Sequence, residues 1–245
     1  MLPPTIRLIA TDMDGTLTCE GKFSSRLLHE LEQLAAAQIP VVIVTGRSAG
    51  WVESVAHYLP VAGAIAENGG LFYTANAAQH ELLVPLPSFE AHRAKLAHMF
   101  AELQQRFPHL VESSDNRFRI TDWTFDVTDL SVEDLNWMND HCQQLGWGFT
   151  YSTVQCHIRP LAQDKAIALQ HVLHRYYPDL TSQQVVTVGD SPNDQSLFNP
   201  EMFPYSVGVA NVRHYLAQLS FAPAHITAAA EVDGFCEVMQ QVLAQ

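Results

Sequence analysis

Short runs rich in apolar residues alternate with stretches of helical apolar spacing in both the first and the last third of the chain. The runs predict buried strands, and apolar positions three or four apart predict helices. The predicted strands are residues 6–10, 41–44, 62–66, 185–189 and 205–209. The predicted helices are residues 27–34, 49–58, 164–176, 194–198 and 231–243. This order is typical of a parallel sheet joined by right-handed helical crossovers.

The pattern changes between about residues 85 and 160. A helix predicted at 89–107 precedes two segments of apolar–polar alternation, and a helix at 132–145 precedes two more. These four predicted strands are residues 117–121, 124–128, 148–151 and 154–159. We therefore predict a Rossmann-like, doubly wound α/β core formed by residues 1–83 and 161–245. An α+β domain at 84–160 would be inserted into it.

Composition agrees with this fold class. The 245-residue chain is 47% hydrophobic and 16% charged, which is typical of a globular protein that buries its own core. Acidic residues outnumber basic residues by 26 to 13, a formal charge of −13, and the few lysines and arginines are scattered. The chain therefore lacks the concentrated positive charge with which proteins bind nucleic acid or anionic membranes.

The four cysteines form neither a CxxC pair nor a disulfide framework, which favours a reducing compartment. The apolar runs are strand-sized, too short to span a membrane. Asp12 and Asp14 follow the first run before a signal peptide could form. We expect a soluble, cytoplasmic protein.

Acidic residues at predicted strand ends are the main chemical signal. Asp12 and Asp14 follow the first strand, and Asp190 and Asp194 follow the strand at 185–189. The carboxyl ends of parallel strands meet at one edge of a sheet, so these carboxylates should converge. Like charges this close need a cation or a proton between them, and Mg²⁺ binds few carboxylates together with water and phosphate. Either pair alone would fit a turn or a helix cap equally well.

Two other positions suit a phosphate group. Thr45-Gly46-Arg47 follows the second strand and opens a helix, so a hydroxyl and free backbone N–H groups face the same edge. Lys165 starts a helix, where the helix dipole disfavours a cation, so a functional reason is plausible there. Taken singly, Thr45 could be a simple helix cap and Lys165 a surface residue.

Together these residues resemble the haloacid dehalogenase superfamily of aspartate-nucleophile phosphatases. Its four signatures occur in order as Asp12-x-Asp14-Gly15-Thr16, Thr45-Gly46-Arg47, Lys165 and Gly189-Asp190-x-x-Asn193-Asp194. Glu67-Asn68-Gly69-Gly70 and Gly208-Val209-Ala210-Asn211 resemble subgroup IIB, the Cof-type and sucrose-phosphatase-like members, with an α/β cap after the third core strand. Asp164 beside Lys165, and Ser191, depart from the usual pattern without altering a reacting group.

The resemblance implies a mechanism. Asp12 would attack phosphorus to form an aspartyl-phosphate, and Asp14 would act as general acid and then as general base. Mg²⁺ would be held by the carboxylates of Asp12 and Asp190 and by the main-chain carbonyl of Asp14. Asp194 would lie next to these ligands.

The resemblance also implies a phosphate site and a substrate class. Thr45, the Gly46 amide and Lys165 would hold the phosphoryl oxygens. Arg47, Asn68 and Asn193 are further candidates for substrate contact. The substrate would be a small phosphorylated metabolite, either a sugar phosphate or a phosphorylated hydroxy acid.

Alternation in the insert indicates where substrate selection could occur. In 155–159, Gln155, His157 and Arg159 should point away from the apolar Cys156 and Ile158, and in 117–120 the arginines Arg117 and Arg119 should point away from Phe118 and Ile120. Two helices cover one face of a small sheet, so the polar face would be left free. The resemblance to capped phosphatases implies that this face closes over the active site. A merely solvated face fits the same pattern.

Two other functions share these residues. Sugar phosphomutases resemble the same subgroup and pass the phosphoryl group to a second hydroxyl instead of water. A binding module without catalysis could use the same fold, but the intact Asp12, Asp14, Lys165 and Asp190 argue against it. The leading hypothesis is a Mg²⁺-dependent phosphomonoesterase.

Overall fold

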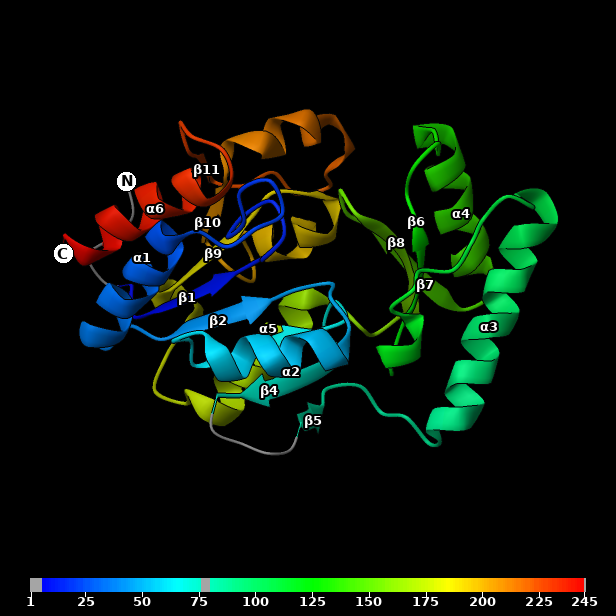
Figure 1. Ribbon diagram of the computed structural model, residues 1–245, viewed down its shortest axis with the longest axis horizontal. Coiled ribbons are helices and arrows are strands. Elements are labelled where there is room, and N and C mark those ends of the chain that lie inside the picture. The colour runs from blue at the N-terminus through cyan, green and yellow to red at the C-terminus, as the bar shows by residue number, and fades with distance from the viewer. Residues whose placement is uncertain (1–5, 76–79, 245) are drawn as a thin grey trace.

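A computed structural model of the chain describes residues 6–75 and 80–244. Its main feature is an eight-stranded sheet, here called the core sheet, with strand order β11-β10-β9-β1-β2-β3-β4-β5 (Figure 1). Six of these strands are parallel: β1 (Leu8–Thr11), β2 (Val41–Val44), β3 (Gly63–Ala66), β9 (Val185–Gly189), β10 (Tyr205–Gly208) and β11 (His225–Ile226). The other two, β4 (Leu71–Thr74) and β5 (His80–Leu82), run antiparallel at one edge.

Helices cover both faces of the core sheet. On one face lie α1 (Ser25–Ala36), α2 (Ala49–Tyr58) and α6 (Glu231–Leu243); on the other lie α5 (Lys165–Tyr176) and the 3₁₀ segment η3 (Pro192–Phe198). Strand β1 is apolar up to Thr11 because helices cover both of its faces. Ile9 packs with the helices of the first face, while Leu8 and Ala10 pack with α5 and η3 on the other. A strand buried on both faces needs a continuous apolar run.

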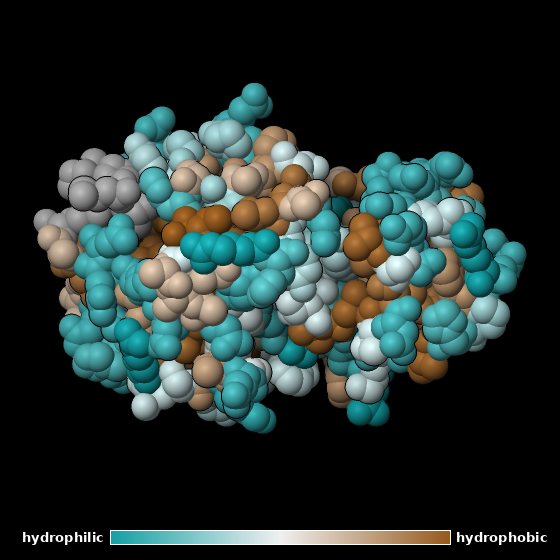
Figure 2. Space-filling view, turned by 90° about the horizontal axis from the view of Figure 1, so that it is seen from above, coloured by the Kyte–Doolittle hydropathy of each residue, from teal (hydrophilic) through white to brown (hydrophobic). Residues whose placement is uncertain are grey.

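The insert forms a second, three-stranded antiparallel sheet with order β6-β8-β7. Its elements are α3 (Phe89–Arg106), η1 (Asn116–Phe118), β6 (Trp123–Asp126), α4 (Val132–Gln144), β7 (Trp147–Tyr151) and β8 (Gln155–Pro160). Helices α3 and α4 cover one face only, which carries Phe125, Cys156 and Ile158. The insert lies beyond the carboxyl ends of the parallel strands, and Figure 2 shows two lobes joined at a narrower waist.

Most predicted elements are present within a few residues, and the α/β core with its separate α+β sheet is confirmed. The antiparallel hairpin β4–β5 and the short β11 were not predicted. Three further 3₁₀ segments were also missed: η2 (Ser182–Gln184), η4 (Ala210–His214) and η5 (Leu216–Gln218). In the ranges 6–75 and 80–244, no helix is both long and apolar enough to cross a membrane.

The predicted strand at 117–121 is wrong. Residues Asn116–Phe118 form a 3₁₀ turn, and Arg119 turns inward to bind carboxylates on both sides of it in the sequence. The N–H groups of Ile120 and Thr121, which a strand would offer to its neighbour, instead donate to the side chain of Glu67. Arg117 and Arg119 are therefore not strand residues of the insert sheet, and Arg119 instead donates to Gln155 of β8.

Candidate active site

Polar residues converge where the parallel strands of the core sheet end. Asp12 follows β1, Thr45 follows β2, and Asp190 follows β9. The turn after β1 passes so close to β9 that a Cβ on Gly15, whose φ is +79°, would lie 2.5 Å from Asp190 Oδ2. A side chain there would push the two acidic loops apart, which explains the glycine.

Three buried carboxylates and one buried ammonium form the centre of the site. Asp12, Asp190 and Asp194 can each place an oxygen within 4.8 Å of the others. Lys165, the first residue of α5, donates at 2.6 Å to Asp12 Oδ1 and at 2.6 Å to Asp194 Oδ1. Asp194 also accepts from the N–H groups of Asp190 and Ser191. These two hydrogen bonds orient the loop after β9.

The carboxylates of this cluster outnumber its ammonium, and burial together with their mutual repulsion shifts their pKa values. Burial and the nearby Asp194 raise the pKa of Asp12 well above its ordinary value, and burial and Asp12 do the same to the pKa of Asp190. Burial alone would lower the pKa of Lys165, but its ion pairs with Asp12 and Asp194 raise it instead. One ammonium against three carboxylates leaves two negative charges unbalanced, which fits a divalent cation.

Asp14 is neutralised separately. Arg47 Nε donates to Asp14 Oδ2 at 2.8 Å, and Arg47 Nη2 donates to Oδ1 at 2.5 Å. Such a two-point pair fixes the carboxylate in one plane. Sequence reasoning placed Arg47 beside the substrate and missed this contact; the only signal was that both residues follow neighbouring strands.

The loop after β2 is shaped to bind a small group closely. A Cβ on Gly46 would lie 3.1 Å from Asn68 Nδ2 and 3.1 Å from His157 Cε1, so the core and the insert meet there. Asn68 Oδ1 accepts from Asn193 Nδ2 at 3.1 Å, while Asn68 Nδ2 is buried without a partner among the described residues. This amide is available to a ligand oxygen.

The structure brings most of the predicted residues together. A small cavity is lined by Asp12, Asp14, Thr45, Gly46, Arg47, Ser152, Val154, Gln155, His157, Ser191 and Asn193. Of the residues that the sequence places on the polar face of the insert, Gln155 and His157 line it. Arg159 lies beside Lys165 and donates to the carbonyl of Gln163, while Arg117 is exposed on a turn against the ring of Phe118.

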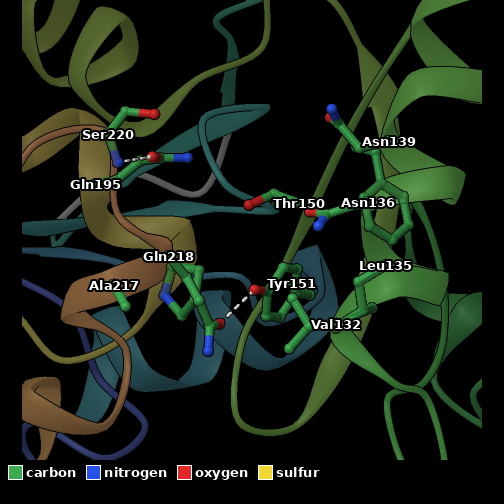
Figure 3. A pocket seen from close by; sticks show the side chains of 12 residues that line it. Val132, Leu135, Asn136, Asn139, Thr150, Tyr151, Gln195, Ala217, Gln218 and Ser220 are labelled. Carbon is green, nitrogen blue, oxygen red and sulfur yellow. Dashed lines mark hydrogen bonds between the residues drawn. The ribbon is translucent and has the colours of Figure 1, made fainter.

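A larger cavity lies nearby. It has a volume of about 360 Å³ and separates α4 and β7 from the core segments η3 and η5. Figure 3 shows Tyr151 donating to Gln218 across it, at 2.6 Å, and the side chains of Asn136 and Thr150 directed into it. Among the residues that the structure describes, none that lines this cavity is charged. It therefore offers nothing to balance a phosphate, and the charged cavity is the candidate active site.

Comparison with known proteins agrees with this geometry. A family model described as haloacid dehalogenase-like hydrolase matches residues 9–128 and 97–239. A phosphoglycolate phosphatase from Methanothrix thermoacetophila is 24% identical, with 98% of each chain covered.

Solved structures share the fold at low sequence identity. A protein from Thermoplasma acidophilum superimposes with a TM-score of 0.79 at 20% identity, covering 98% of this chain and 100% of that one. The sucrose-phosphatase from Synechocystis sp. PCC6803 gives a TM-score of 0.67 at 15% identity, covering 97% and 98%. With the family match spanning both lobes, this chain belongs to the haloacid dehalogenase-like hydrolases.

Proposed function

We propose that the protein is a Mg²⁺-dependent phosphomonoesterase that releases phosphate from a small phosphorylated metabolite through an aspartyl-phosphate. The observation that carries this proposal is the buried set of Asp12, Asp190, Asp194 and Lys165, which has an excess of two negative charges. A structural ion pair would be balanced. An excess of negative charge in a cavity suits a divalent cation.

Asp12 is the nucleophile in this mechanism. Its free carboxylate oxygen forms a bond to phosphorus as the bond from phosphorus to the ester oxygen breaks. Asp14, after taking up a proton from solvent, gives that proton to the leaving oxygen, which departs as an alcohol. Asp14 then takes a proton from water as the water oxygen attacks phosphorus, and the bond to Asp12 breaks. Phosphate leaves, and both aspartates return to their starting states.

Neighbouring residues would position the phosphoryl group. Lys165 holds Asp12, and Thr45 and the N–H of Gly46, which line the cavity, would supply hydrogen bonds to the transferred oxygens. Mg²⁺ would be held by Asp12, Asp190 and the main-chain carbonyl of Asp14, where it would neutralise charge on the phosphate. Arg47 must release one oxygen of Asp14 before that carboxyl reaches the leaving group.

We assign residues 84–160 as a cap over this site, with 1–83 and 161–245 as the core. The observed cavity supports the assignment because Gln155 and His157 of β8 line it together with Asp12 and Thr45. The substrate is then a sugar phosphate or a phosphorylated hydroxy acid. Relatives named for phosphoglycolate and for sucrose phosphate span the same two classes.

The direct test is phosphate release from a panel of sugar phosphates and phosphorylated hydroxy acids in the presence of Mg²⁺. We expect inorganic phosphate from at least one of them with the wild-type protein and none with Asp12→Asn. Transfer of the phosphoryl group to a second sugar hydroxyl, with no free phosphate, would instead establish a phosphotransferase.

Replacing Asp14 should separate substrates by their leaving groups. Asp14→Asn cannot donate a proton, so we expect kcat on an alkyl phosphate to fall by about 10²- to 10⁴-fold. p-Nitrophenyl phosphate, whose leaving group needs little protonation, should lose far less. Steady-state kinetics on both substrates measure this, and equal losses would contradict the acid role of Asp14.

A further inference from the structure

The segment of the insert that carries Arg119 is hydrogen-bonded to the core. Glu67 at the end of β3 accepts from the N–H groups of Ile120 and Thr121 and from the Thr121 hydroxyl. From the insert side, His92 binds the carbonyl of Thr121 and Arg93 binds that of Asp122. The position of Arg119 relative to the core is therefore set by its neighbours.

Arg119 is buried and uses both terminal nitrogens of its guanidinium. Nη2 donates to Asp115 Oδ2 at 2.8 Å and to Gln155 Oε1 at 2.9 Å. Nη1 donates to Asp122 at 2.9 Å and, at 2.9 Å, to the main-chain carbonyl of Gly46. The last contact crosses from the insert to the loop that faces the phosphoryl site.

The contact fixes one peptide unit from both ends. Arg119 holds the carbonyl of the Gly46–Arg47 peptide, and Thr45 Oγ1 accepts from its N–H at 3.1 Å. The next atoms along the chain belong to Arg47, whose side chain donates two hydrogen bonds to Asp14. A rotation of this peptide would move both the Gly46 loop and the partner of Asp14.

Asp122 joins Arg119 to the wall of the cavity. It accepts from Arg119 and, through Oδ2, from His157 Nδ1 at 2.8 Å, and all three side chains are buried. Burying these charges is unfavourable unless each is paired in good geometry. A planar guanidinium reaches its acceptors in several directions at once, and a lysine ammonium does not.

Resting on the proposed function, we propose that Arg119 is a positioning residue for phosphoryl transfer, which acts through the Gly46–Arg47 peptide and not through the substrate. Substitution of a residue that contacts the leaving group would lower kcat only for substrates whose leaving group is large enough to reach that residue. Arg119 instead acts on the loop that every phosphoryl group meets. Substitution of Arg119 should therefore lower kcat by the same factor on every substrate.

The test uses Arg119→Met, which keeps the length of the side chain and removes its donors. We expect kcat to fall about 10- to 100-fold, by the same factor on p-nitrophenyl phosphate and on glucose 6-phosphate, because small misplacements in an active site have effects of this size. Inhibition by inorganic phosphate should weaken in parallel. Arg119→Lys should lie between the wild type and Arg119→Met.

Matched controls separate the possible outcomes. Arg106→Met removes an exposed arginine of the insert that stacks on Trp137, and it should leave kcat unchanged. If Arg119→Met does not fold, Asp115→Ala, which removes one acceptor near the surface, should give a smaller loss that is again equal on both substrates. A folded variant with normal kcat, or a loss confined to one substrate, overturns the inference. An inactive wild type would overturn the proposed function instead.

Discussion

Asp12→Asn is expected to lower kcat by more than about a thousandfold, since removing a nucleophile disables the whole catalytic unit. An amide does not attack phosphorus, and it no longer contributes a negative charge to the metal site. Lys165 keeps its bond to Asp194, so the fold should survive. Phosphate release measures the loss of turnover, and the melting temperature measures the fold.

The control is Asp179→Asn, which removes a carboxylate of the same kind from an exposed position outside the site. It should retain wild-type activity. Substantial turnover by a folded Asp12→Asn variant would rule out the aspartyl-phosphate mechanism.

Removal of divalent cations should abolish activity as completely as the Asp12→Asn substitution does. With Asp12, Asp190 and Asp194 buried around a single ammonium, no other cation among the described residues balances the site. Exhaustive EDTA treatment should therefore bring turnover to background, and Mg²⁺ should restore it. Ca²⁺ should not, because its longer and looser coordination misplaces the reacting groups.

The metal experiment has an internal check. Asp190→Asn should raise the Mg²⁺ concentration needed for half-maximal activity, because it removes one charged ligand and leaves the nucleophile in place. Full activity after chelation, or an unchanged Mg²⁺ requirement in Asp190→Asn, would contradict the proposed metal site.

The core of the site could be predicted from the sequence because its geometry follows from a simple rule. Residues directly after parallel strands share an edge of the sheet, so Asp12, Thr45 and Asp190 meet whatever the details of the loops. The place of Lys165 at a helix start was an ambiguous signal, and its role was predicted from the family resemblance; the structure pairs it with two carboxylates. The roles of these residues in catalysis stay predictions.

The insert was predicted less well because its residues respond to distant partners. Arg117 to Ile120 alternate as a strand would, but the N–H groups of Ile120 and Thr121 bond to Glu67 of the core, more than 50 residues earlier in the chain. His157 was expected on an open polar face and is buried against Asp122. Period-two alternation reports which side chains are apolar, and it carries no information on whether a polar side chain will find a buried partner.

The bonds from Glu67 also govern how the two lobes come apart. Its buried carboxylate depends on N–H groups 53 and 54 residues further along the chain, beyond the first connection to the insert. Opening the insert alone would leave that carboxylate with the N–H of Ala49 and without its donors from the insert, which makes partial unfolding unfavourable. We therefore expect core and insert to unfold together, so that a destabilising substitution in either lobe lowers the stability of both.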